Sequence, residues 1–132
     1  MNGETNLRQL IRTMKPRLNK GDYIFCTVAS LDAIDQKKII CLFKEDEGYT
    51  VILEKELADQ LKLNYSFVAA WITLTIHSSL EAVGLTAAFS DALAKENISC
   101  NVVAAFYHDH IFVNKKDAIL AMRVLSELGF AG

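Results

Sequence analysis

The chain has 132 residues and a mass of 14.7 kDa, with 52% hydrophobic residues, 23% charged residues and a formal net charge of −2. This length fits one compact domain or two small lobes, and the charge excludes the basic surface that nucleic-acid binding requires. No apolar run approaches the roughly 20 residues of a membrane-spanning helix. Residues 1–6 do not resemble a secretory signal. We therefore expect a cytoplasmic protein that binds neither nucleic acid nor membranes.

The two halves of the chain differ in their number of charged residues. Residues 1–66 contain ten basic and ten acidic residues, whereas residues 67–132 contain four and six. The charge-poor surface of the second half needs to be covered by the first half, by another subunit, or by both. The sequence therefore predicts two lobes, residues 1–66 and 67–132, in a homo-oligomer.

The first half combines helical and strand patterns. It is predicted to form, in chain order, a helix at 7–14, strands at 23–29, 39–43 and 49–53, and a helix at 53–64. Pro16 ends the first helical pattern. Gly48 lies in the turn of an antiparallel hairpin, so the acidic run before it is interpreted as a solvated loop rather than a metal site.

The second half has the pattern of a split βαβ unit. It is predicted to form a strand at 71–77, a helix at 85–97, strands at 101–106 and 111–113, and a last helix that ends before Gly129. Thr alternates with apolar residues in the first of these strands, which is typical of a half-buried strand. The polar residues 107–110 are interpreted as a tight turn. Because no strand follows the last helix, the first half or another chain is expected to complete this sheet.

The three cysteines are expected to be free. Cys26, Cys41 and Cys100 lie in or next to apolar strand-like segments, are odd in number and show no C-x-x-C spacing. Buried free cysteines behave as small hydrophobic residues. We therefore predict reduced side chains without a redox or nucleophilic role.

Three segments carry a resemblance to a known family. Residues 72–88, which include Glu81-Ala82-Val83-Gly84-Leu85, together with 98–101 and 107–113, resemble the ACT domain, a small ferredoxin-like module that senses amino acids in metabolic enzymes. They are similar in particular to small stand-alone bacterial ACT proteins with no assigned activity. Residues 1–66 look like the divergent ACT-like N-terminal lobe of those proteins. The resemblance implies an α+β fold with tandem ferredoxin-like βαββαβ lobes and antiparallel sheets.

The resemblance also implies an amino-acid site where the helix after the first ACT strand begins. The positive helix end and free N–H groups would bind a carboxylate, and Gly84 lets the backbone approach the ligand. Glu81 and Ser99 stand where the family holds the ammonium and carboxylate groups. The expected ligand-binding residues are Glu81, Val83, Gly84, Leu85, Thr86, Ser99, His77 and His108.

The only histidines, His77, His108 and His110, are expected at one end of the sheet. Three interpretations are open for these histidines: a metal site, contacts to a ligand or subunit, or hydrogen bonds at a hairpin tip. We predict no metal site. Asp109 beside them suits acid–base chemistry, but no nucleophile spacing, phosphate loop or paired carboxylate accompanies it. We therefore expect no catalytic residue, no cofactor and no enzymatic activity.

The resulting hypothesis is a stand-alone oligomeric ACT module that binds an amino acid or similar zwitterion. The alternatives are a permanent oligomer that binds no ligand and, third, a metal-dependent enzyme that uses the histidines.

Overall fold

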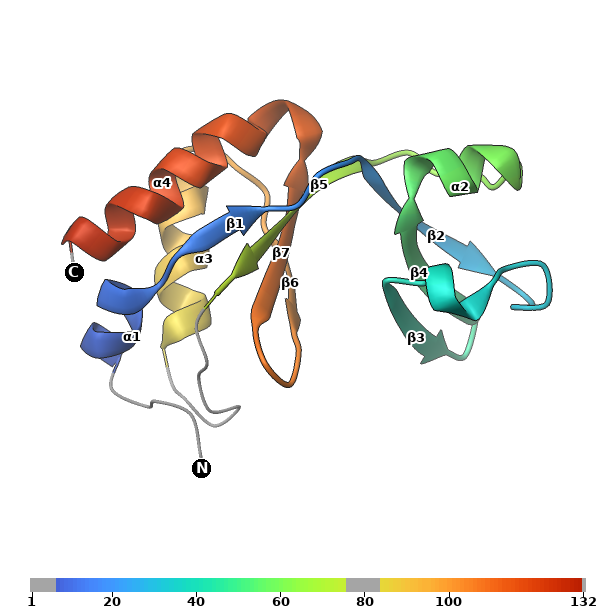
Figure 1. The fold of residues 1–132 in the computed structure, drawn as a ribbon, viewed down its shortest axis with the longest axis horizontal. Helices are drawn as coiled ribbons and strands as arrows, with labels where there is room; N and C mark the ends of the chain where they lie inside the picture. The colour runs from blue at the N-terminus through green and yellow to red at the C-terminus, as the bar shows by residue number, and fades with distance from the viewer. Residues whose placement is uncertain (1–6, 76–83, 132) are drawn as a thin grey trace. The chain divides into compact units, whose positions relative to one another are not determined.

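The computed structural model describes residues 7–75 and 84–131 of the chain, which divide into two compact units. Unit 1 consists of residues 7–20, 70–75 and 84–131, and unit 2 consists of residues 21–69. The chain passes from one unit to the other twice, after Lys20 and after Ala69. Each unit contains a β-sheet with helices (Figure 1).

The helices and strands follow one another in the order α1 (Leu7–Thr13), β1 (Pro16–Leu18), β2 (Tyr23–Val28), β3 (Cys41–Glu45), β4 (Gly48–Glu54), α2 (Lys55–Gln60), β5 (Val68–Leu74), α3 (Leu85–Lys95), β6 (Asn101–Ala104), β7 (Asp109–Asn114) and α4 (Ala118–Ala131). Two 3-10 turns, η1 (Gln36–Lys38) and η2 (Lys115–Asp117), precede β3 and α4.

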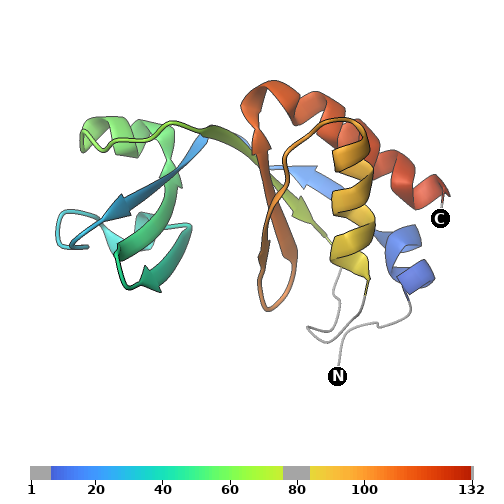
Figure 2. The ribbon, with the colours of Figure 1, turned by 180° about the vertical axis from the view of Figure 1, so that it is seen from behind.

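The sheet of unit 1 has the strand order β1-β5-β7-β6. β1 pairs antiparallel with β5, with Pro16 opposite Leu74 and Leu18 opposite Ile72, and β6 pairs antiparallel with β7. Helices α1, α3 and α4 pack together beside this sheet (Figures 1 and 2). The order is that of a ferredoxin-like βαββαβ fold in which the N-terminal β1 takes the place of the last strand.

Alternation along β5 separates a core face from an opposite face. Ala70, Ile72 and Leu74 join the buried cluster that also includes residues of α1, α3, β7 and α4. Trp71 and Thr73 point the other way because successive strand residues alternate between faces. The helices therefore cover one face of the sheet, and the second face carries polar and aromatic side chains.

Unit 2 repeats the same strand order with fewer helices. Its strands are arranged as β3-β4-β2, followed by the beginning of β5, where Ile24 pairs with Val68. Val51, Leu53 and Ala58 lie in its core. Where unit 1 has α3 between its first two strands, unit 2 has only residues 29–40 with the short turn η1. Both units are thus ferredoxin-like, as expected for the α+β class.

Several sequence predictions need correction. The strand β1 was not predicted. It pairs with β5, so the first half of the chain does complete the sheet of the second half, as expected. Leu53 belongs to β4, so the helix α2 is shorter than residues 53–64. Asp109 and His110 lie in β7, and the turn of this hairpin is at residues 105–108. In each case hydrogen bonding to a neighbouring strand overrides the local pattern.

The compact units also differ from a simple division at residue 66. Leu10 and Met14 of the N-terminal segment are buried in the core of unit 1. The physical reason is β1, which adds to the edge of β5 and brings α1 with it. The division of the sequence into lobes 1–66 and 67–132 stays a prediction.

Leu10→Ala should lower the free energy of unfolding of unit 1 by about 2–5 kcal/mol, because it leaves a cavity in a core position that is 0% exposed. Urea unfolding followed by the fluorescence of Trp71, the single tryptophan, measures this. The control Ile119→Ala changes a side chain that is 77% exposed and should alter stability by less than about 0.5 kcal/mol. Equal effects of the two substitutions would contradict the assignment of α1 to unit 1.

Candidate functional site

The start of α3 is the described part of the expected amino-acid site. Gly84 precedes the helix with φ 94° and ψ −14°, in the left-handed region. A Cβ at this position would lie 3.0 Å from Leu7 Cδ2. Two independent constraints, the backbone angle and the approach of α1, therefore require glycine here.

The first two residues of α3 differ in exposure. The side chain of Leu85 is 3% exposed and belongs to the core, so Leu85 can offer a ligand only its backbone. Thr86 is exposed, and its carbonyl oxygen accepts a hydrogen bond from Ser90 Oγ at 2.6 Å. The first turn of α3 contains no acidic side chain. The positive end of the helix dipole is thus left without a carboxylate in its own first turn, which favours an anion.

The structure places Ser99 away from Gly84. Helix α3 has 11 residues, and at roughly 1.5 Å per residue its ends are about 15 Å apart. Ser99 is exposed and follows the C-terminal end of this helix, whereas Gly84 precedes its N-terminal end. One amino acid cannot touch both residues in a single unit.

The β6–β7 turn, which ends at His108, lies at the end of unit 1 where α3 begins (Figures 1 and 2). His108 and Gly84 are therefore at the same end of the unit. Glu81, Val83 and His77, the other expected site residues, lie outside the described residues, and so does the strand end that was expected to reach His77.

A hydrogen-bonded network lies on the sheet face opposite the helices. Trp71 Nε1 donates to His110 Nδ1 at 3.0 Å, and Thr73 Oγ1 lies 3.1 Å from the same nitrogen. Asn19 Nδ2 donates to Thr73 Oγ1 at 2.9 Å, which satisfies a hydroxyl on a residue that is 0% exposed. The Trp71 ring stacks on Phe112 with an interplanar angle of 20°. Sequence reasoning did not single out Asn19 because its partners are more than 50 residues away.

This network fixes the protonation state of His110. The indole N–H can only donate, so Nδ1 of His110 must accept and the ring proton lies on Nε2. Burial lowers the pKa of His110, and the positive charges of His108 and Arg17 lower it further. The arrangement therefore holds His110 as a neutral imidazole.

Within residues 7–75 and 84–131, no three His, Cys, Asp or Glu side chains are grouped to hold an ion. The three-histidine interpretation also needs His77, which lies outside the described residues. His108 and His110 have ring centroids 6.4 Å apart, and Trp71 already occupies Nδ1 of His110. Asp109 is 9% exposed, and burial raises its pKa while His108 opposes that shift.

The cysteines are free, as expected. Burial raises the pKa of the Cys100 thiol to about 11 and also raises that of Cys26. Because the thiolate is the nucleophilic form, neither side chain has the environment of a catalytic cysteine.

Models of the ACT domain match the chain over residues 2–70 and over residues 66–127. With this fold and two such matches, the chain belongs to the ACT-domain family. No curated protein matches the sequence. No helix in the described parts of the chain is long and apolar enough to cross a membrane.

Solved structures extend this assignment. A Vibrio cholerae protein of unknown function, described as a possible transport protein, is 48% identical, with a TM-score of 0.85 over 93% of this chain and 95% of that one. The ligand-free regulatory subunit of aspartate kinase from Thermus thermophilus is 8% identical, with a TM-score of 0.62 over 88% of this chain and 99% of that one. The second likeness shows the fold alone. No catalytic family is indicated by these matches.

Gly84→Ala should lower the free energy of unfolding by about 1–3 kcal/mol, because alanine is strained at this φ and its methyl group would displace Leu7. Urea unfolding with Trp71 fluorescence reports the loss. Thr86→Ala, two residues along and exposed, should change stability by less than about 0.5 kcal/mol. An unchanged Gly84→Ala protein would contradict the conformation described for this turn.

The neutral state of His110 also predicts a pH dependence. Its pKa in the folded protein lies below 6.5, so the unfolded chain takes up the proton first. Stability should therefore fall as the pH is lowered from about 6.5 through the folded pKa. Urea unfolding of wild type and His110→Gln between pH 5 and 8 tests this, because the variant should lose this component of the pH dependence.

The His108→Gln variant provides the matched control. It removes one of the positive charges near His110 and should raise the pH at which Trp71 fluorescence responds. The His110→Gln comparison isolates the contribution of the imidazole that is bonded to Trp71. Identical fluorescence titrations of Trp71 in wild type and His110→Gln would refute the role of this ring.

Proposed function

We propose that this protein is a stand-alone regulatory ACT module of the cytoplasm that binds an amino acid or similar zwitterion and has no catalytic activity of its own. The observation that carries the proposal is the pair of ACT matches, which together span residues 2–127. The Vibrio cholerae relative supports the stand-alone form, because the similarity covers 95% of that chain. ACT domains are regulatory modules, so the proposed role is to report ligand concentration to a partner.

The ligand site in this proposal is at the start of α3, where the first N–H groups of the helix and the positive end of its dipole favour an anion. Gly84 and Thr86 would contact the carboxylate side of the ligand, with Glu81, Val83, His77 and His108 around it. Ser99 is too far along α3 to contribute in the same unit, so it would be contributed by a second copy. The proposal therefore makes the ligand site depend on a homo-oligomer.

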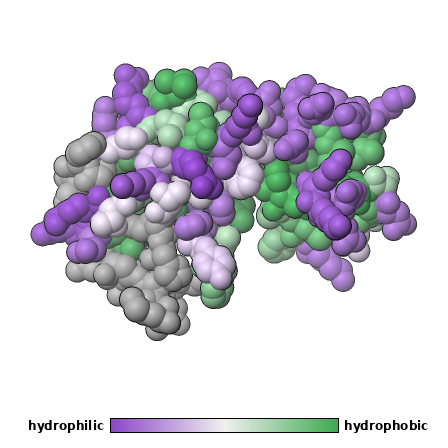
Figure 3. Space-filling view, in the orientation of Figure 1, coloured by the Kyte–Doolittle hydropathy of each residue, from purple (hydrophilic) through white to green (hydrophobic). Residues whose placement is uncertain are grey.

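Exposed apolar side chains support such an assembly. Edge strand β3 carries Leu42 and Phe43, which are 45% and 67% exposed, and the β6–β7 turn carries Phe106 and Tyr107, which are 68% and 67% exposed. On the face drawn in Figure 3, apolar residues gather beside hydrophilic ones over unit 2. These same side chains favour the second candidate function, a permanent assembly without a ligand.

Thermal unfolding with each of the twenty amino acids tests the proposal. A ligand at about 100 times its Kd should add roughly 2.7 kcal/mol of stability. Thr86→Val and Ser99→Ala should each abolish the shift, whereas Ser66→Ala, an exposed serine of unit 2, should retain it. Sedimentation velocity should show an oligomer in each variant. An intact oligomer that no amino acid stabilises would instead favour the permanent assembly.

A further inference from the structure

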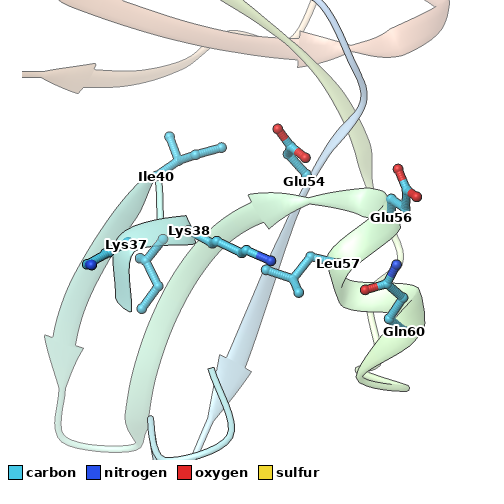
Figure 4. A pocket seen from close by; sticks show the side chains of 8 residues that line it. Lys37, Lys38, Ile40, Glu54, Glu56, Leu57 and Gln60 are labelled. Atoms are coloured by element: carbon cyan, nitrogen blue, oxygen red, sulfur yellow. The ribbon is translucent and has the colours of Figure 1, made fainter. Parts of the chain in front are cut away.

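The two units differ in the sign of their net charge. The described residues of unit 1 include nine Lys or Arg and five Asp or Glu, whereas those of unit 2 include five and nine. A division of the sequence at residue 66 hides this difference, because the basic residues of α1 and β1 precede the acidic segments of unit 2. The pocket of about 520 Å³ between η1 and α2 belongs to unit 2, and its carboxylates, Glu54 and Glu56, point away from the ammonium group of Lys38 (Figure 4). An anionic ligand is therefore favoured on unit 1 rather than on unit 2.

The sheet face of unit 1 opposite the helices brings a row of three side chains together across three strands. Arg17 on β1 is opposite Thr73 on β5, and Thr73 Oγ1 lies 3.1 Å from Nδ1 of His110 on β7. With about 4.8 Å between neighbouring strands, the backbones of Arg17 and His110 are about 10 Å apart. Arg17 is exposed and His110 is half-buried, so their side chains can reach a common ligand over Thr73.

Both ends of this row are available as hydrogen-bond donors. Because Nδ1 of His110 accepts the indole N–H of Trp71, the ring proton lies on Nε2, and no residue in the described parts of the chain accepts a hydrogen bond from it. Arg17 forms no ion pair with a described residue. A guanidinium group can bind two oxygen atoms side by side, and the imidazole N–H can bind a third.

The surroundings of this row are positively charged. In the four strands of the sheet, Asp109 is the only acidic residue. Successive residues of β7 point to opposite faces, so Asp109 lies on the core side with Ile111, and His110 lies on the other side. The His108 ring is centred 6.4 Å from the His110 ring, and the positive charges of His108 and Arg17 both lower the pKa of His110. The strands thus place no carboxylate on this face that would compete with an anion.

We propose that this face of unit 1 binds a phosphoryl group over Thr73. The guanidinium group of Arg17 binds two of its oxygen atoms, the Nε2–H of His110 binds a third, and His108 adds positive charge beside them. A phosphoryl group fits better than a carboxylate because it offers three acceptor oxygen atoms and carries close to two negative charges at neutral pH. This site goes beyond the proposed function, since it differs from the amino-acid site at α3 in both place and ligand.

Trp71 reports on the site directly, because its indole N–H is bonded to His110 and it is the single tryptophan of the chain. Titration of the full chain with inorganic phosphate, at constant pH and ionic strength, should change Trp71 fluorescence and shift the imidazole NMR signals of His110. Acetate has two oxygen atoms and a single charge, so it should bind about tenfold or more weakly. Equal affinities for phosphate and acetate, or no change at His110, would overturn the proposal.

AMP distinguishes the two sources of a phosphoryl group. It carries this group on a nucleoside whose purine ring can stack on the half-buried Trp71. Tighter binding of AMP than of inorganic phosphate would identify a phosphorylated metabolite as the ligand. Tighter binding of inorganic phosphate would identify the free anion. Both results support the site, whereas failure of both compounds to bind would refute it.

Variants locate the site and separate it from the one proposed at the start of α3. Arg17→Gln should weaken phosphate binding about tenfold or more, as expected for loss of charge-assisted hydrogen bonds. Arg17→Lys should recover only part of this loss, because an ammonium group lacks the planar fork. Arg12→Gln, which removes an exposed positive charge of α1 outside the sheet, should leave binding unchanged. Phosphate binding that survives Arg17→Gln but is lost in Thr86→Val would place the anion at α3 and overturn this proposal alone.

Discussion

The pairing of β1 with β5 is the interaction on which the rest of unit 1 depends. It involves only residues 16–18 of β1, but hydrogen bonds extend it at both ends. The N–H of Asn19 donates to the carbonyl of Trp71 at 2.8 Å, and the N–H of Thr75 donates to the carbonyl of Lys15 at 2.9 Å. This short strand closes the edge of the sheet and positions α1, so Leu7 comes to lie against Gly84.

The same pairing explains the polar face of the sheet. Asn19 follows β1 directly and meets Thr73 because β1 runs beside β5. Thr73 then lies next to His110 on β7, whose free Nδ1 lone pair accepts the indole N–H of Trp71. The buried hydroxyl of Thr73 and the half-buried imidazole of His110 are tolerated here because both are hydrogen-bonded. The network thus joins three strands through side chains as well as through the backbone.

Sequence reasoning recovered the elements whose patterns are local. Alternation identified β5, helical spacing of Leu85, Phe89 and Leu93 identified α3, and the resemblance at residues 72–88 supplied the family. The short strand β1 was missed because three residues beginning with Pro16 show no period. The i+4 spacing of Leu53 with later leucines wrongly extended α2, since Leu53 is paired within β4.

The candidate sites were harder to predict because they depend on tertiary placement. The predicted helix at 85–97 already implied that Gly84 and Ser99 lie at opposite ends of one helix, but the family resemblance assigned both residues to one ligand site. The pocket between η1 and α2 depends on the absence of a helix between β2 and β3, and that absence was visible in the sequence as a connection too short for a helix.

The chain connectivity of unit 1 has a consequence for folding. Asn19 and Trp71 are bonded across 52 positions of sequence, and nearly all the intervening residues form unit 2. Closing a flexible loop of that length carries an entropy cost that grows with the logarithm of its length. If unit 2 folds first, its own pairing of β2 with β5 draws the two ends together before β1 docks. In that order of folding, unit 2 holds the two ends of the loop close together, and β1 pairs with β5 last.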